Sequence, residues 1–353
     1  MTENKRTMSS MGPEPESSER FRISPFDTSL LAKWDSIVNQ APQGTIFHNM
    51  NWLEIVEKHT KSKLYPIMIL KGEEVVSVFP IFLRKVSFLN ALSSPHGSSS
   101  VPYLGPLFPH FDEYKQDKKE SILKGFQDEF NDFTRMMKAG YISIVFSPGV
   151  VDVRQYQWSG YEVKPQYTYV QKLSDEKSAW EGLKKALRKN ITNATEKGVT
   201  IGEGTKEDID FIYASVLKRL EDQEQSLNMP KEYFHDLYDA FCPKNLHVFV
   251  AEYKNAKVGG VITTCYNGRV SVWFGAVQTE ISGLYPNDLL HWHVMKWAVE
   301  QGFKEFEIIG ANRPTISFFK SRYNLGLRMY LSATKSSSFV KRLQGVFKFL
   351  HKR

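Results

Sequence analysis

The stretch LHVFVAEYKNAKVGGVITTCYNGRVSVWFGAV, residues 246–277, decides the fold. Period-two alternation of apolar and polar side chains predicts three β-strands, at 246–253, 258–266 and 269–277. The connections between them are short, and Asn267-Gly268 in the second connection is a strong signal of a β-hairpin. We therefore expect an antiparallel three-stranded meander in the second half of the chain.

Helical and strand patterns surround this meander in a definite order. Before it, the spacing of apolar residues predicts helices over 180–197, 207–221 and 231–241. After it come a helix over 286–301, with Pro286 at a favoured first-turn position, a strand at 303–309, a short helix at 314–323 and a strand at 326–333. The first half repeats a shorter version of this order, with a helix at 52–59, strands at 65–70 and 75–85, a helix over 113–139 and a strand at 141–147.

Length and composition support two globular domains. A chain of 353 residues with 41% hydrophobic and 13% aromatic residues can bury two cores. The first twenty residues are polar and predict a flexible leader rather than a signal peptide. The two cysteines, Cys242 and Cys265, match no metal or redox spacing and favour a reducing, cytoplasmic compartment.

The net charge of +7 is localised rather than spread over the surface. Residues 328–353 carry seven basic residues and no acidic ones, and the other 39 Lys and Arg balance the 39 Asp and Glu. A basic body that wraps nucleic acid non-specifically is therefore not indicated. In the tail SSSFVKRLQGVFKFLHKR (336–353), apolar residues at helical spacing lie beside basic ones. This pattern predicts either a helix on an anionic membrane surface or one docked on its own domain.

Three segments of the second half resemble the Fem peptidyltransferase and FemAB-like acyltransferase family. They are LKKALRKNITNATEKGVTI (183–201), YPNDLLHWHVMKWAVEQGFKEFEIIG (285–310) and SFFKSRYNLG (317–326). In the first half, TIFHNMNWLEIV (45–56) and YLGPL (103–107) fit more loosely. Leu104 and His48 depart from the family pattern, where Arg and Gln are common, and no helical-hairpin insertion is present.

The resemblance implies an α+β fold of two linked acetyltransferase-like (GNAT) domains, with mixed, mostly antiparallel sheets flanked by helices. We place the first domain at 21–165, the second, catalytic domain at 166–333, and the basic amphipathic helix at 334–353. The implied activity is transfer of an aminoacyl or acyl group from an activated donor to an amine of a cell-envelope precursor. Aminoacyl-tRNA is the favoured donor, and no permanently bound cofactor is expected.

Lys320 is the leading catalytic candidate. Acyl transfer to an amine passes through a tetrahedral oxyanion, which a fixed cation stabilises. The alternatives are that Lys320 holds a donor phosphate or is a surface lysine. Because the donor ester is already activated, the absence of a GxSxG nucleophile motif is expected. Phe319 is a candidate for stacking on the donor's base.

His291 is the second catalytic candidate, as a relay for the proton that the amine loses. His291 and His293 do not predict a metal site, because side chains two apart on a helix point about 200° apart. The resemblance adds a set of substrate-binding candidates: Arg219, Arg188, Tyr285, Asn287 and Tyr103. Arg219 and Arg188 could equally be solvated helix residues.

The segment AVQTEISGLYPND, residues 276–288, bears on the donor. In a standard acetyl-CoA enzyme the corresponding loop is glycine-rich and cradles the pyrophosphate with backbone N–H groups. Gly283 is present here, but closely spaced glycines are not. Two alternatives to the Fem-type activity stay open: an acyl-CoA-dependent N-acyltransferase of polysaccharide or lipid biosynthesis, and a non-catalytic binding protein. The partners expected are the donor, the amine acceptor and, through residues 336–353, the inner membrane surface.

Overall fold

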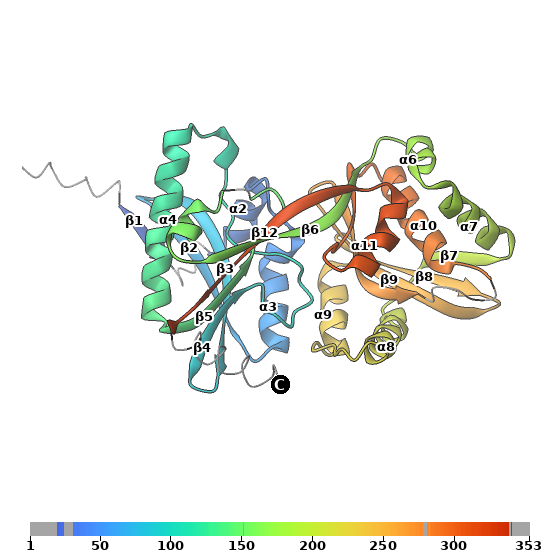
Figure 1. Cartoon of the computed structure of the whole chain (residues 1–353), viewed down its shortest axis with the longest axis horizontal. Helices are drawn as coiled ribbons and strands as arrows, with labels where there is room; N and C mark the ends of the chain where they lie inside the picture. The colour runs from blue at the N-terminus through green and yellow to red at the C-terminus, as the bar shows by residue number, and fades with distance from the viewer. Residues whose placement is uncertain are drawn as a thin grey trace, which may run out of the picture.

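Twelve strands of the chain join in one continuous, strongly twisted sheet (Figure 1). The computed structural model describes residues 20–24, 31–150, 152–277, 281, 283–338 and 340. The strand order across the sheet is β1-β2-β3-β4-β5-β12-β6-β11-β10-β9-β8-β7. Strands of the first half thus occupy one end of the sheet, strands of the second half the other, and β12 and β6 lie between them.

The first lobe is a mixed sheet with helices on both faces. Its strands are β1 (Phe21–Ser24), β2 (Lys63–Lys71), β3 (Glu74–Val86), β4 (Leu89–Ser94) and β5 (Ala139–Val145). Its helices are α2 (Trp34–Gln40), α3 (Met50–His59), α4 (Gln116–Met136) and α5 (Arg154–Trp158). All pairs in this part are antiparallel except β4 with β5.

The second lobe contains the predicted meander. Its strands are β7 (Val199–Glu203), β8 (Leu246–Tyr253), β9 (Ala256–Tyr266), β10 (Arg269–Val277) and β11 (Glu305–Ile308). Its helices are α6 (Glu176–Gly182), α7 (Lys185–Glu196), α8 (Asp208–Glu221), α9 (Lys231–Phe241), α10 (Pro286–Glu300) and α11 (Pro314–Lys320). Here β10 and β11 form the parallel pair.

A two-stranded antiparallel ribbon belongs to both lobes. It consists of β6 (Glu162–Lys172) and β12 (Gly326–Ser336), which pair from Gly326 opposite Val170 to Thr334 opposite Glu162. One end of β6 pairs with β11 of the second lobe, and the far end of β12 pairs with β5 of the first. The last strand of the chain therefore completes the sheet of the first lobe.

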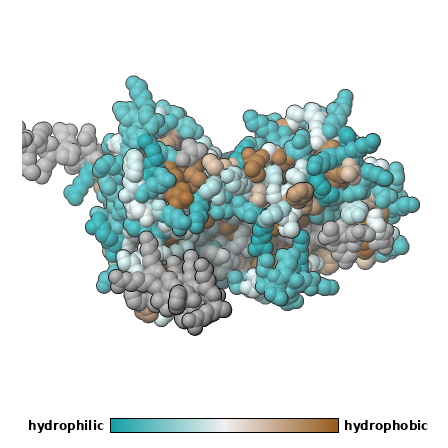
Figure 2. Space-filling model, viewed as in Figure 1, coloured by the Kyte–Doolittle hydropathy of each residue, from teal (hydrophilic) through white to brown (hydrophobic). Residues whose placement is uncertain are grey.

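Three clusters of buried apolar side chains hold this arrangement. One lies in the first lobe under α4 and includes Phe79, Phe126 and Phe130. Another lies in the second lobe under α7 and α10. The third is shared, because residues of α2 and α3 pack in the same cluster as residues of α8 and α9. The lobes therefore meet through a continuous core, and Figure 2 shows the notch that remains between them on the viewed face.

The helices and strands predicted for the second half are confirmed with one correction, and β6 and β7 were not predicted. The meander strands, α8, α9 and α10 lie within one or two residues of their predicted bounds. The helix predicted over 180–197 is wrong, since the chain forms two helices, α6 and α7. They are separated at Leu183, whose backbone is extended and whose side chain turns into the core.

The predicted domain limits fall inside strands of the ribbon. The limit between 165 and 166 lies in β6, and the limit between 333 and 334 lies in β12. The polar leader and nearly all of the basic tail lie outside the described residues, so both stay predictions. Within the described part of the chain, every helix is too short or too polar to cross a lipid bilayer.

Ala333 provides a test of the shared strand. Its side chain is fully buried in the first-lobe core although it lies near the end of the chain. We expect Ala333→Asp to lower the free energy of unfolding by roughly 3 kcal/mol or more in urea titrations, because it buries an unpaired charge. Ser332→Asp, at a partly exposed neighbour, is the control and should cost less than roughly 1 kcal/mol. Equal effects of the two substitutions would contradict the assignment of β12 to the first-lobe core.

Candidate active site

The site is built where β11 ends beside β10. The parallel pairing of these strands stops at Val272 and Ile308, and the chain then turns toward β6, where the Ala311 amide donates to the Tyr167 carbonyl at 2.9 Å. Lys320, the last residue of α11, extends its ammonium group into this turn. It donates to the carbonyls of Ile309 and Gly310, the latter at 2.5 Å. A lysine cation is thereby held at the end of β11.

Lys320 is buried, with 8% of its surface exposed. Burial disfavours the charged form and lowers the pKa of its ammonium to about 8, although the nearby Glu307 carboxylate works in the opposite direction. The surface-lysine alternative is therefore wrong. An ammonium has three hydrogens. Two are used by the carbonyls, and within the described residues the third has no partner.

His291 and Phe319 lie next to Lys320. The His291 ring is 5.7 Å from the Phe319 ring and 5.5 Å from the Tyr323 ring. Its Nδ1 donates to the Asn287 carbonyl at 2.9 Å, so the neutral ring carries no proton on Nε2. Burial lowers the pKa of His291 to about 4. His293 contacts the Phe249 ring instead, so the two histidines face different neighbours.

A buried ion pair occupies the start of α10. Asp288 lies in its first turn with 1% of its surface exposed. Its carboxylate accepts hydrogen bonds from Arg322 at 2.8 and 3.3 Å, from Asn190 at 2.9 Å and from Tyr323 at 3.4 Å. The Arg322 guanidinium also lies over the Phe319 ring, 4.8 Å from its centroid. This ion pair links α7 and α10 to the turn that follows α11, around the side chains that flank Lys320.

Glu307, on β11, is a fully buried carboxylate at the junction of the lobes. It accepts hydrogen bonds from the hydroxyls of Tyr103 at 2.8 Å, Thr168 at 2.7 Å and Ser271 at 3.0 Å. The Arg269 guanidinium is 3.7 Å away. Burial and the Glu307 charge raise the pKa of the Tyr103 hydroxyl well above its usual value, so it stays a donor. Tyr103 comes from the first lobe, and the other partners come from the ribbon and β10.

A second carboxylate, Glu305, anchors the two arginines on this side of the sheet. Arg269 and Arg328 both bind it, each at 2.6 Å. Burial works to raise the pKa of Glu305, but the two guanidinium groups outweigh it and lower the pKa to about 2. Glu305 therefore stays ionised, and it holds Arg269 in place beside Glu307.

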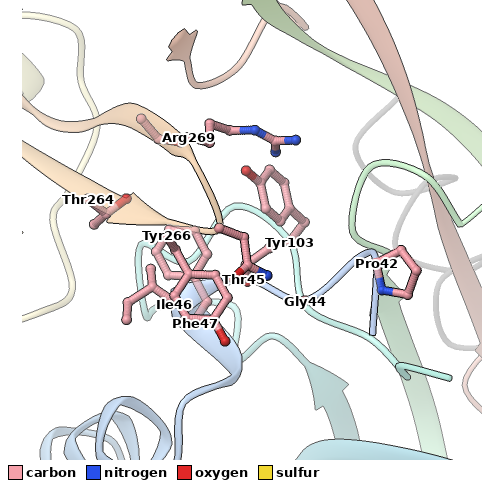
Figure 3. A pocket seen from close by; sticks show the side chains of 11 residues that line it. Pro42, Gly44, Thr45, Ile46, Phe47, Tyr103, Thr264, Tyr266 and Arg269 are labelled. Atoms are coloured by element: carbon pink, nitrogen blue, oxygen red, sulfur yellow. The ribbon is translucent and has the colours of Figure 1, made fainter. Parts of the chain in front are cut away.

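A small cavity of about 70 Å³ opens between the lobes next to this cluster. Residues 42–47 of the first lobe form one wall, and β9 and β10 form the other. Figure 3 shows the Arg269 guanidinium and the Tyr103 hydroxyl side by side at one end of it. This volume holds about two water molecules. Tyr103 and Ser271, two of the residues whose hydroxyls bind Glu307, line this cavity.

Three of the remaining predicted site residues lie near the Lys320 or Glu307 clusters, and in the described part of the chain the two arginine side chains have no polar contact with either cluster. Asn287 and Tyr285 are half-buried at the start of α10, beside His291 and Asp288. Tyr103 belongs to the Glu307 cluster. Arg188 is half-buried on α7, and Arg219 is exposed in the last turn of α8. Among the described residues neither arginine side chain has a polar partner, and no contact brings Arg219 to Lys320.

Sequence reasoning missed Glu307, Asp288 and Arg322. Glu307 had a detectable signal, since an acid between the apolar residues Phe306 and Ile308 of the strand EFEI is expected to be buried only when paired. Its partner Tyr103 lies 204 residues away in the chain, so the pair itself could not be predicted. Asp288 lies in a first helical turn, where acids are common for other reasons.

The neutral state of His291 predicts a pH effect on stability. Its pKa is about 4 when folded and about 6.5 when unfolded, so the unfolded chain binds more protons as the pH falls between these values. We expect the free energy of unfolding to drop by about 2 kcal/mol from this group between pH 7 and pH 5. His48, also buried with a lowered pKa, adds a loss in the same direction. The His291→Gln variant should lose correspondingly less than wild type, and an identical pH dependence would contradict the assignment.

Comparisons with known proteins agree with this architecture. Residues 182–321 match the family model described as acetyltransferase (GNAT) domain. No curated protein sequence matches the chain. The structure is similar to FemX, with a TM-score of 0.63 and 14% identity over 85% of this chain and 95% of that one. It is also similar to L-PGS from Bacillus licheniformis, with a TM-score of 0.52 and 13% identity over 90% and 95% of the two chains.

A tandem GNAT protein from the clavulanic acid biosynthesis pathway has the same arrangement, with a TM-score of 0.56 and 11% identity over 90% of this chain and 98% of that one. At these identities the structures show a shared fold, and the family match covers the lobe that carries Lys320. Residues 182–321 therefore form a domain of the acetyltransferase (GNAT) type, the kind of domain that acyltransferases carry, and the whole chain shares the tandem fold of these structures.

Proposed function

We propose that the protein transfers an aminoacyl group from aminoacyl-tRNA to an amine of a cell-envelope precursor, with Lys320 at the reacting centre. The observation that carries this proposal is a buried lysine ammonium, fixed by two carbonyls at the end of β11, with its third hydrogen left for a ligand. Such a cation suits the oxyanion that forms when an amine attacks an ester carbonyl.

The chemistry needs little more than this cation and a proton acceptor. The amine nitrogen bonds to the ester carbon, the carbon–oxygen bond of the ester breaks, and the ribose oxygen leaves with a proton. The attacking amine loses a proton, and Nε2 of neutral His291 is the acceptor that we assign. No protein nucleophile takes part, because the donor is already activated.

The structure at the start of α10 favours aminoacyl-tRNA over acyl-CoA as the donor. A CoA pyrophosphate would need free backbone N–H groups at this helix terminus. Pro286 has none, the Asp288 amide donates to the Tyr285 carbonyl at 3.0 Å, and the Asp288 carboxylate already occupies the turn. This arrangement disfavours a diphosphate at that position.

A basic helix lies directly beside this terminus. Asn190 of α7 binds Asp288, and Lys184, Lys185 and Lys189 around that helix are exposed. Leu187, Ile191 and Ala194 face the core, as the helical spacing predicts. Exposed lysines on one helix suit a polyphosphate backbone, so they support a nucleic-acid donor over a small thioester.

Exposed apolar side chains near the site support an acceptor with an apolar part. Phe318, next to Phe319, is 81% exposed, and Leu327 and Met329 on β12 are 59% and 48% exposed. The neighbouring Ser317 hydroxyl meets the Tyr169 hydroxyl at 2.8 Å, and Tyr169 is the register partner of Leu327. An apolar surface therefore adjoins the Lys320 site on α11 and the ribbon.

The second candidate function is transfer from acyl-CoA. The acetyltransferase family match over residues 182–321 is the observation that favours it. The same Lys320 and His291 roles would apply, and the α10 terminus would then have to bind the pyrophosphate in another way.

The proposal predicts a specific loss in Lys320→Ala. Once wild type has established an active donor and acceptor pair, single-turnover transfer by this variant should be slower by roughly 10²-fold or more. The rate of wild type should also fall as the pH rises above about 8, where the lysine loses its proton. Lys320→Arg, which stays charged, should not show that decline.

Two controls accompany this measurement. Lys177→Ala, at an exposed position on α6, should transfer at the wild-type rate. Unchanged turnover in Lys320→Ala, with substrates that wild type uses, would rule out the oxyanion role.

A further inference from the structure

The turn that follows β11 is held in place by a continuous chain of hydrogen bonds. Thr168 donates to Glu307 at 2.7 Å, and the Gly310 amide donates to the Thr168 hydroxyl at 3.3 Å. On the other side of the same residue, the Gly310 carbonyl accepts from Lys320. The position of the lysine ammonium thus depends on Gly310, whose amide donates to the same Thr168 hydroxyl that binds Glu307.

Gly310 has a backbone conformation that residues with a side chain rarely adopt. Its φ is +87°, in the left-handed region that glycine adopts without strain. The next residues are fixed by the ribbon as well. The Asn312 side chain accepts from the Tyr167 amide at 2.8 Å and donates to the Tyr330 hydroxyl at 3.2 Å. The turn therefore has one defined geometry.

Glu307 also connects this turn to the first lobe. Tyr103 is the partner from that lobe, and its ring packs against the Tyr330 ring at 5.7 Å. Burying a carboxylate costs free energy unless every partner is present. Three hydroxyl donors supply those partners: Tyr103 and Ser271 donate to Oε2, and Thr168 donates to Oε1. Removing the Thr168 hydroxyl therefore leaves a buried acceptor unsatisfied.

We propose that Glu307 is the positioning residue of this active site. Its carboxylate orients the Gly310 peptide through Thr168, and with it the carbonyl that holds Lys320, and it connects this turn to the first lobe through Tyr103. This inference rests on the proposed function only for the use of Lys320 in transfer, since the coupling of Glu307 to Lys320 is a property of the unliganded protein.

Several charged groups surround this pair and have to be considered together. His291 of α10 interacts with the charges of Lys320, Asp288 and Arg322, and Arg322 pairs with Asp288. Arg269 lies 3.7 Å from Glu307, and Glu305 and Arg328 neutralise each other beside it. Glu307 is therefore the nearby negative charge that raises the pKa of Lys320, against the effect of burial.

The test measures the protonation of Lys320 directly in the full-length chain. Protein labelled with carbon-13 at the lysine ε position is titrated by NMR, and the Lys320 signal is identified by its loss in Lys320→Arg. Wild type should titrate near pH 8. Glu307→Gln should lower that midpoint by roughly one unit or more, because it removes the nearby negative charge that favours the ammonium form. Glu300→Gln removes an equal charge from an exposed site on α10 and should leave the midpoint unchanged.

A second pair of variants tests the hydrogen-bond chain without changing the charge. Thr168→Val removes the hydroxyl between Gly310 and Glu307, and Thr168→Ser keeps it. The Lys320 signal should move in the valine variant and return to its wild-type position in the serine variant. If Glu307→Gln does not fold, the comparison of Thr168→Val with Thr168→Ser tests the proposal by itself.

An unchanged Lys320 midpoint in folded Glu307→Gln, or an unmoved signal in Thr168→Val, would overturn the assignment. Neither measurement needs a donor or an acceptor. A failure of the proposed acyl transfer would appear instead as unaltered turnover in Lys320→Ala, so the two results are distinguishable.

Discussion

The pairing of β6 with β12 makes one sheet out of two lobes, and the active site depends on it. β6 enters the second lobe beside β11, and β12 returns the end of the chain to β5. Because both strands are continuous across the junction, a turn anchored on Tyr167, Thr168 and Tyr330 has a fixed position relative to both cores. The lobes cannot separate without breaking main-chain hydrogen bonds, so the site is preorganised rather than assembled on binding.

Two buried carboxylates hold different parts of the site in place. Asp288 holds Arg322 against Phe319 on the α10 side of the sheet, whereas Glu307 fixes the turn that carries the carbonyl partners of Lys320. Each is satisfied by several donors, which is the condition under which a buried charge is tolerated. The result is a lysine cation that is partly desolvated and oriented, as electrostatic stabilisation of an oxyanion requires.

The sequence predicts the local parts of this account and not the long-range ones. The meander and α10 follow from short-range periodicity, an Asn-Gly turn and a first-turn proline, and they are found at the predicted residues. The break between α6 and α7 was not predictable, because the inward turn of Leu183 depends on tertiary packing. Lys320, Phe319 and His291 were candidates from sequence, and the structure brings them together. Glu307 joins Tyr103 and Thr168 across more than a hundred residues, so only the fold could reveal it.

The identity of the acyl donor, aminoacyl-tRNA or acyl-CoA, provides the most direct test of the proposed function. A short RNA duplex with an amide-linked aminoacyl group at its 3′ end mimics charged tRNA and cannot react. Its binding can be measured by fluorescence anisotropy in competition with CoA. We predict that it binds with an affinity that falls as salt is raised, as phosphate contacts require, and that millimolar CoA does not displace it. Displacement by CoA, together with RNA binding that does not depend on the aminoacyl group, would contradict the account.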